Sequence, residues 1–207
     1  MQLEVFVIGC MTLAGEMPGP QVLTIDHIRE LETRVAQDPE NTASVNLLAD
    51  NYALVILGVT SLNKLGLPDR LDSTLAASEF AGHARKALTD SKLPLLLGEG
   101  ATALWKYRLG GVGAMVPREL QKEAGDLSSQ LLDRAIALDP KNSEWRGQRI
   151  EATILNANFN GLSTVEAWAR VKADLDSLTG DTRYYKLAHA AELAERAGKA
   201  DDAVVLA

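Results

Sequence analysis

Hydrophobic residues recur along this chain at the three- and four-residue spacing of amphipathic helices. Ile25, Ile28, Leu31 and Val35 form the first such stripe. Side chains three and four positions apart share one face of an α-helix, so this spacing predicts helices with one buried side. No segment shows the alternation that predicts a strand. The predicted helices cover residues 25–35, 42–62, 73–88, 93–109, 120–138, 143–158, 163–178 and 181–197, with another starting near residue 199.

Two peptides of the form Asp-Pro-x-Asn, residues 38–41 and 139–142, end one predicted helix and start the next. Proline lacks a backbone N–H and disfavours helical geometry in the residue before it. Asn41 in the first corner, and Asn142 or Ser143 in the second, can then cap the following helix. The corners are 101 residues apart. That distance is about three times 34 residues, the period of tetratricopeptide repeats.

Other positions resemble the tetratricopeptide-repeat family in a degenerate form. The matching residues are Leu48, Ala49 and Tyr52 after the first corner, Leu132, Ala135 and Pro140 around the second, and Leu187, Ala190, Ala191, Gly198 and Ala203 near the end. Arg149, Ile150 and Thr153 depart from the motif. The resemblance implies an all-α fold in which antiparallel helical hairpins stack as a right-handed solenoid over residues 21–207. Insertions at 63–72 and 110–117 are needed to keep the register.

The last predicted hairpin ends early in its second helix, at residues 204–207. This stretch is apolar, whereas the terminal repeat of a stacked array usually presents a polar cap. We therefore expect the natural chain to continue past Ala207, or a partner chain to cover this end.

The first 20 residues form a separate N-terminal segment. Residues 7–10 resemble the lipobox of bacterial lipoproteins, which makes Cys10 a candidate site of lipidation and residues 11–20 a candidate tether. The alternative is a terminal segment with an inert cysteine, because no basic residue precedes the apolar run and Glu4 interrupts it. The protein is then expected either in the cytoplasm or as a lipoprotein of the bacterial cell envelope.

Charge and composition narrow the class of partner. The net charge is −7 and no basic stretch is visible, which argues against nucleic-acid binding. Aromatic residues make up only 5% of the chain, which favours helix over sheet. No segment reaches the uncharged length that a transmembrane span needs, since Glu99, Lys106 and Arg108 interrupt the most apolar helix.

Sequence motifs for catalysis are absent. His27, His83 and His189 lie far apart and lack the spacing of a metal site. No serine nucleophile motif, activated cysteine or phosphate-binding loop is present. We therefore expect no catalytic residues, no metal site and no cofactor, and a protein that is not an enzyme.

The family resemblance implies a concave groove lined by the first helix of each hairpin. Its candidate residues are Asn46 and Asp50 after the first corner, and Glu144, Gln148 and Glu151 after the second. This set is polar to acidic, which favours a basic or neutral protein or peptide. The expected function is thus a non-enzymatic scaffold for protein–protein interaction. The alternative is a small-ligand-binding envelope lipoprotein, because the irregular hairpins and the lipobox are faintly similar to periplasmic T-component lipoproteins of TRAP transporters.

Overall fold

The computed structural model describes residues 25–58, 78–109, 116–159, 161–178 and 180–206. These residues form helices and turns and contain no strand, which confirms the all-α prediction for the described part of the chain. The helices are α1 (Ile25–Gln37), α2 (Thr42–Ile56), α3 (Ser78–Asp90), α4 (Pro94–Leu109), α5 (Arg118–Leu138), α6 (Ser143–Phe159), α7 (Thr164–Leu175), α8 (Gly180–Arg196) and α9 (Ala200–Leu206).

Both Asp-Pro-x-Asn corners form the predicted helix–helix turns. The N–H of Asn41 donates to the carbonyl of Asp38 at 3.2 Å, and the N–H of Asn142 donates to the carbonyl of Asp139 at 3.2 Å. The Asn41 side chain accepts from the N–H of Ser44 at 3.0 Å, and the Asn142 side chain accepts from the N–H of Glu144 at 3.0 Å. The asparagines therefore satisfy N–H groups that the start of a helix leaves free.

Other helix ends follow their local sequence, with one correction. Ser163 caps α7 by accepting from the N–H of Glu166 at 3.2 Å, and Gly198 turns the chain before α9 with a φ of 72°. The helix predicted over 42–62 instead ends at Ile56. Gly58 adopts a φ of 66°, a left-handed conformation that stops a helix, and its N–H donates to the carbonyl of Val55.

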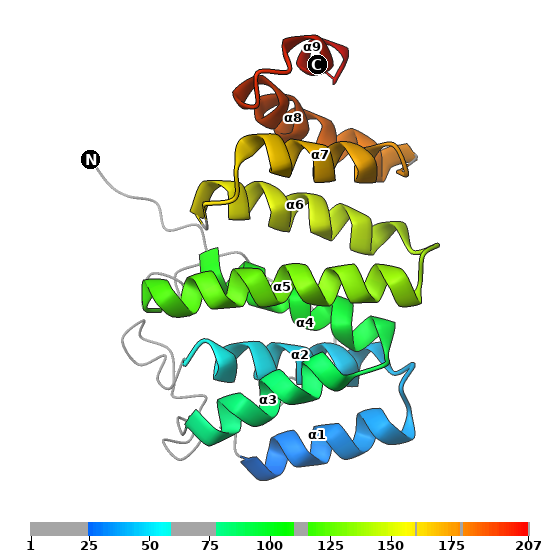
Figure 1. Ribbon diagram of the computed structural model, residues 1–207. Coiled ribbons are helices and arrows are strands. Elements are labelled where there is room, and N and C mark those ends of the chain that lie inside the picture. Colours follow the sequence, from blue (N-terminus) through cyan, green and yellow to red (C-terminus); the bar gives the residue numbers. More distant parts are fainter. Residues whose placement is uncertain (1–24, 59–77, 110–115, 160, 179, 207) are drawn as a thin grey trace, which may run out of the picture.

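The helices stack from α1 at the bottom to α9 at the top of Figure 1, with α3 seen between α1 and α2. Each helix packs against the next, and α2, α4, α6 and α8 also contact one another in sequence. These four even-numbered helices thus form a continuous layer, which we call the even-helix layer. The corners α1–α2, α3–α4 and α5–α6 all lie on one side of the stack, at the right in Figure 1.

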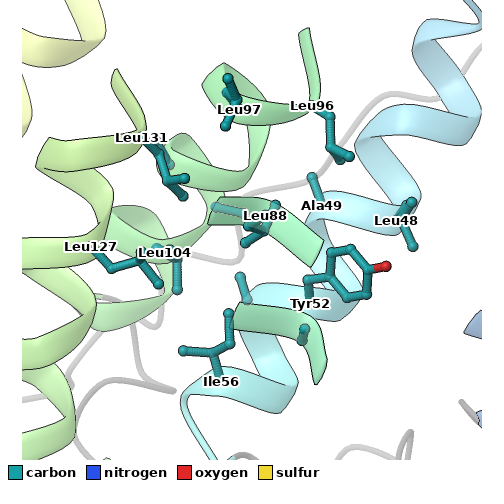
Figure 2. Close-up of a cluster of buried hydrophobic side chains, with 14 of the residues drawn as sticks. Leu48, Ala49, Tyr52, Ile56, Leu88, Leu96, Leu97, Leu104, Leu127 and Leu131 are labelled. Atoms are coloured by element: carbon teal, nitrogen blue, oxygen red, sulfur yellow. The ribbon is translucent and has the colours of Figure 1, made fainter. Parts of the chain in front are cut away.

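The core is extended along the stack rather than concentrated in one centre. The larger cluster of buried side chains comes from α1 to α5 and includes Trp145 and Ala152 of α6. Figure 2 shows its middle, where leucines of α4 and α5 meet Leu48, Tyr52 and Ile56 of α2. The smaller cluster joins α6 to α8 and includes Ile150. Helix α6 contributes to both clusters and so connects them. In stacked repeats, likewise, the stability of each hairpin depends on packing against the next one.

The two corners are separated by two hairpins within the described ranges, whereas their spacing of 101 residues is about three tetratricopeptide periods. Among the described helices, the first corner joins α1 to α2 and the second joins α5 to α6, so two hairpin steps separate them. Each of these two hairpins therefore spans more residues than the roughly 34 of a tetratricopeptide repeat, and the 21-residue α5 is one reason. Insertions are expected at 63–72 and 110–117, and of these the structure describes only residues 116 and 117.

The expectations for residues 1–20, including Cys10, also lie outside the described residues. Near the other end, Val204 and Val205 of α9 are 77% and 84% exposed, and the expectation of a covered or continued end stays a prediction. No helix in the described ranges has the length and apolarity needed to cross a membrane.

Candidate partner-binding face

The structure places the predicted groove residues on the even-helix layer. Asn46 and Asp50 lie on α2, and Glu144, Gln148 and Glu151 lie on α6. Glu144 is exposed and the other four side chains are partly exposed. Helix α4 contacts both α2 and α6, so residues of α4 join the two groups.

Two residues of α4 belong to this face and were not among the predicted groove residues. Glu99 is partly exposed and Lys106, two turns further on, is exposed. The apolar sequence of α4 predicts a buried helix. In the sequence analysis, its charged residues argue only against a transmembrane span. The sequence does contain a signal for this face. Charged side chains in a strongly apolar helix need either a partner or solvent, so Glu99 and Lys106 indicate that one side of α4 is accessible.

Glu144 of α6 and Asp50 of α2 both lie close enough to Glu99 of α4 to repel its carboxylate, and we call the three residues the acidic cluster. Burial raises the pKa of the Glu99 carboxyl, the neighbouring Glu144 raises it further, Lys106 lowers it and Asp50 raises it. Like charges on three successive even helices disfavour the folded state. Such a costly arrangement is typical of a functional site. Among the described residues, no group of three or more histidine, cysteine, aspartate or glutamate side chains is arranged to hold a metal ion.

Glu151 has a different environment from the acidic cluster. Its Oε1 accepts from Lys186 Nζ of α8 at 2.8 Å and lies 3.6 Å from Nδ1 of His189. Glu151 and His189 also line a hollow of about 220 Å³ between α6 and α8, together with Ile154. At this end of the face the negative charge is therefore balanced within the protein.

Asn46 and Gln148 supply neutral polar groups to the same layer. The Oδ1 atom of Asn46 is buried and has no hydrogen-bond partner in the described part of the structure. A buried acceptor without a partner costs free energy. A donor from a bound molecule would recover part of that cost if the side chain rotated towards it.

His83 belongs to a cluster that joins α1, α2 and α3, outside the even-helix layer. Its Nε2 lies 2.7 Å from Oε1 of Glu32, which also accepts from the hydroxyl of Tyr52. Burial is the main cause that raises the pKa of Tyr52, with the Glu32 carboxylate adding to it. Because Tyr52 is almost fully buried in the core, this cluster fastens the first three helices together.

The repulsion at Glu99 leads to a pH-dependent prediction. The folded state raises the Glu99 pKa above its ordinary value of about 4.3, so it binds this proton more tightly than the unfolded state does. The free energy of unfolding therefore falls as the pH rises from the ordinary pKa of Glu99 through its higher pKa in the folded state. We expect Glu99→Gln to be more stable than the wild type at pH 7, with the difference fading below pH of about 4. Urea unfolding at the two pH values measures it.

The matched control is Glu119→Gln, which removes an exposed glutamate from α5, outside the even-helix layer. It should change stability by no more than about 0.5 kcal/mol at either pH. A Glu99→Gln protein that is less stable than the wild type at pH 7 would contradict the electrostatic account of the acidic cluster.

Comparison with known proteins gave no matching family model, no matching curated protein and no matching solved structure. A functional conclusion for this chain therefore depends on its own residues and their geometry.

Proposed function

We propose that this protein is a tetratricopeptide-like helical array that binds a basic or neutral segment of another protein on its even-helix layer. The observation that supports this most is the acidic cluster, in which Glu99 of α4 is repelled by Glu144 of α6 and by Asp50 of α2. An approaching lysine or arginine would relieve this repulsion, so partner binding recovers stability that the free protein lacks. The protein acts as a scaffold and not as an enzyme.

The layered contacts support stacked hairpins as the form of this array, and its resemblance to tetratricopeptide repeats implies a right-handed solenoid. Each helix packs on the next, and the even-numbered helices form a separate continuous row. In tetratricopeptide repeats the first helices of successive hairpins make such a row and present the binding surface. In this proposal α2, α4 and α6, which follow the α1–α2, α3–α4 and α5–α6 corners, are the first helices of the hairpins α2–α3, α4–α5 and α6–α7, and α8 continues their row.

A small-ligand-binding lipoprotein stays the alternative. The segments expected to close its pocket are 63–72 and 110–117, and of these the structure describes only residues 116 and 117. The described hollows lie between helices at the surface and favour neither alternative over the other.

The proposal is tested by selecting short random peptides displayed on phage against the immobilised full chain. The peptides recovered should carry a net positive charge. The most enriched one, labelled with a fluorophore, should bind the variant Asp50→Asn/Glu99→Gln/Glu144→Gln about tenfold more weakly than the wild type, measured by fluorescence anisotropy. Binding to the wild type should weaken with added salt, because screening acts on exposed charges.

The control variant, Asp26→Asn/Glu119→Gln/Asp176→Asn, removes three exposed acids from α1, α5 and the end of α7. The net charge changes by the same amount, so this protein should bind the peptide like the wild type. Enrichment of acidic peptides, or equal weakening in both variants, would reject the even-helix layer as the binding surface.

A further inference from the structure

Three helix–helix corners that are far apart in sequence enclose one hollow on the surface. Pro39 and Glu40 of the first Asp-Pro-x-Asn corner, Leu93 of the α3–α4 corner and Asp139 of the second Asp-Pro-x-Asn corner line it. Its volume is about 440 Å³. We call this hollow the corner pocket. The motif that marks the helix ends in the sequence thus also builds a surface feature.

The pocket has an apolar wall of fixed shape. Leu93 and Leu95 of the α3–α4 hairpin and Trp145 of α6 contribute to it. Trp145 is only 2% exposed, and its ring lies directly against Gly98 of α4, which leaves it no room to move. A volume within the range of ligand pockets and rigid apolar walls suit a bulky aliphatic or proline side chain.

The rim of the pocket is acidic. Glu40 is exposed and Asp139 is partly exposed, and neither carboxylate forms an ion pair within the described residues. Lys92 and Lys141 each directly precede a lining residue in the chain, and Arg134 and Arg146 donate to the carbonyls of Ser91 and Pro140 in two of these corners. No lysine or arginine lines the pocket itself. An apolar group next to a positive charge therefore matches this surface.

We propose that the corner pocket anchors the bound protein segment by taking an aliphatic or proline side chain that is followed or preceded by lysine or arginine. This inference rests on the proposed function, because the pocket adjoins the acidic cluster: Glu144 and Trp145 are consecutive residues in the first turn of α6. A basic segment lying on the even-helix layer would reach the pocket at the corner side of the stack. Burial of its apolar side chain supplies affinity, and the charges supply specificity.

The test is an NMR titration of the ¹⁵N-labelled full chain with three capped synthetic peptides of equal length. One alternates leucine with lysine, the second serine with lysine, and the third leucine with glutamate. The indole N–H signal of Trp145, identified by its loss in Trp145→Phe, and the backbone signals of Glu40, Leu93 and Leu95 report on the pocket. The leucine–lysine peptide should shift these signals and bind about tenfold more tightly than the other two.

Charge reversal at the rim provides the variant. Glu40→Lys changes an exposed side chain and should weaken binding of the leucine–lysine peptide about tenfold, whereas Glu119→Lys on α5 should leave it unchanged. Absence of shifts at the pocket signals overturns the inference. Equal or tighter binding of the serine–lysine or leucine–glutamate peptide overturns it as well, because the pocket would then not select an apolar side chain beside a cation.

The same titration separates this inference from the proposed function. Shifts at Asp50, Glu99 and Glu144 without shifts at the pocket overturn the corner pocket and leave the even-helix layer as a binding surface. Shifts at the pocket alone, with unchanged affinity in Asp50→Asn/Glu99→Gln/Glu144→Gln, overturn the proposed function instead. Shifts at both places, with each variant weakening the binding, support the two together.

Discussion

Replacing Asp174 with asparagine is expected to lower the free energy of unfolding by about 3 kcal/mol. Asp174 on α7 is 1% exposed, and its two carboxylate oxygens accept from Nε and Nη2 of Arg149 at 2.8 and 2.6 Å. Arg146 adds a second cation at 3.6 Å. The amide would keep the shape of the side chain and remove its charge. The guanidinium of Arg149, whose side chain is 22% exposed, would then lose its buried counter-ion.

Arg149 stays charged throughout the accessible pH range. Its hydrogen bonds to Asp174 are the main cause that raises its pKa, burial lowers it, and the hydrogen bond to Asp133 raises it again. Since the cation cannot escape the loss of its partner by releasing a proton, the whole cost should appear as lost stability. Urea unfolding at neutral pH, followed by the helical circular dichroism signal, measures it.

The control uses the other carboxylate on the same arginine. Asp133 of α5 accepts from Nη1 of Arg149 at 2.7 Å, but its side chain is 52% exposed. Water can replace this contact, so Asp133→Asn should cost less than about 1 kcal/mol. Equal losses in the two variants would show that burial of Asp174 does not decide the strength of its pairing.

Gly98→Ala is expected to destabilise the protein by about 2 kcal/mol, although alanine is the better helix former by about 1 kcal/mol. A Cβ atom at Gly98 would lie 2.5 Å from ring carbons of Trp145. The indole is buried between α4 and α6 and belongs to the larger core cluster, so it cannot move aside without disturbing its neighbours. The close approach of α6 to α4 therefore requires glycine at this position.

Two other glycines provide graded controls for this contact. A Cβ at Gly82 of α3 would meet nothing within 4 Å, so Gly82→Ala should stabilise the protein by up to about 1 kcal/mol. A Cβ at Gly100 would lie 2.7 Å from a terminal methyl of Leu88, which can rotate, so its effect should fall between the other two. If Gly98→Ala stabilised the protein as much as Gly82→Ala, the tight packing of Trp145 would be refuted. Thermal and urea unfolding of the three variants decide this order.

Helix ends were the part of the fold that local sequence predicted best. Asn41, Asn142 and Ser163 cap the helices that they precede, and Gly198 turns the chain where the sequence indicated. These devices act within about four residues, so no distant contact is needed to decide them. The end of α2 differs from the prediction because apolar residues continue past Gly58, so the hydrophobic pattern does not mark the turn that this glycine makes.

The candidate site was predicted only in part. Asn46, Asp50 and Glu144 were chosen from their distance after the corners, and they do lie on one layer. Glu99 could not be assigned to that layer, because nothing in the apolar sequence of α4 shows which helix lies on either side of it. The pairing of Glu151 with Lys186 was equally hidden, since 35 residues separate the two.

The sequence by itself determined the helical class, most helix boundaries and the two corners, because hydrophobic period, proline and capping side chains act locally. Only the tertiary structure decided which corners and helices meet. It placed three corners around one pocket, brought three carboxylates together across α2, α4 and α6, and set Trp145 against Gly98. The physical reason is that packing and electrostatic repulsion depend on distances between helices, and these follow from the burial of the whole core rather than from any short segment.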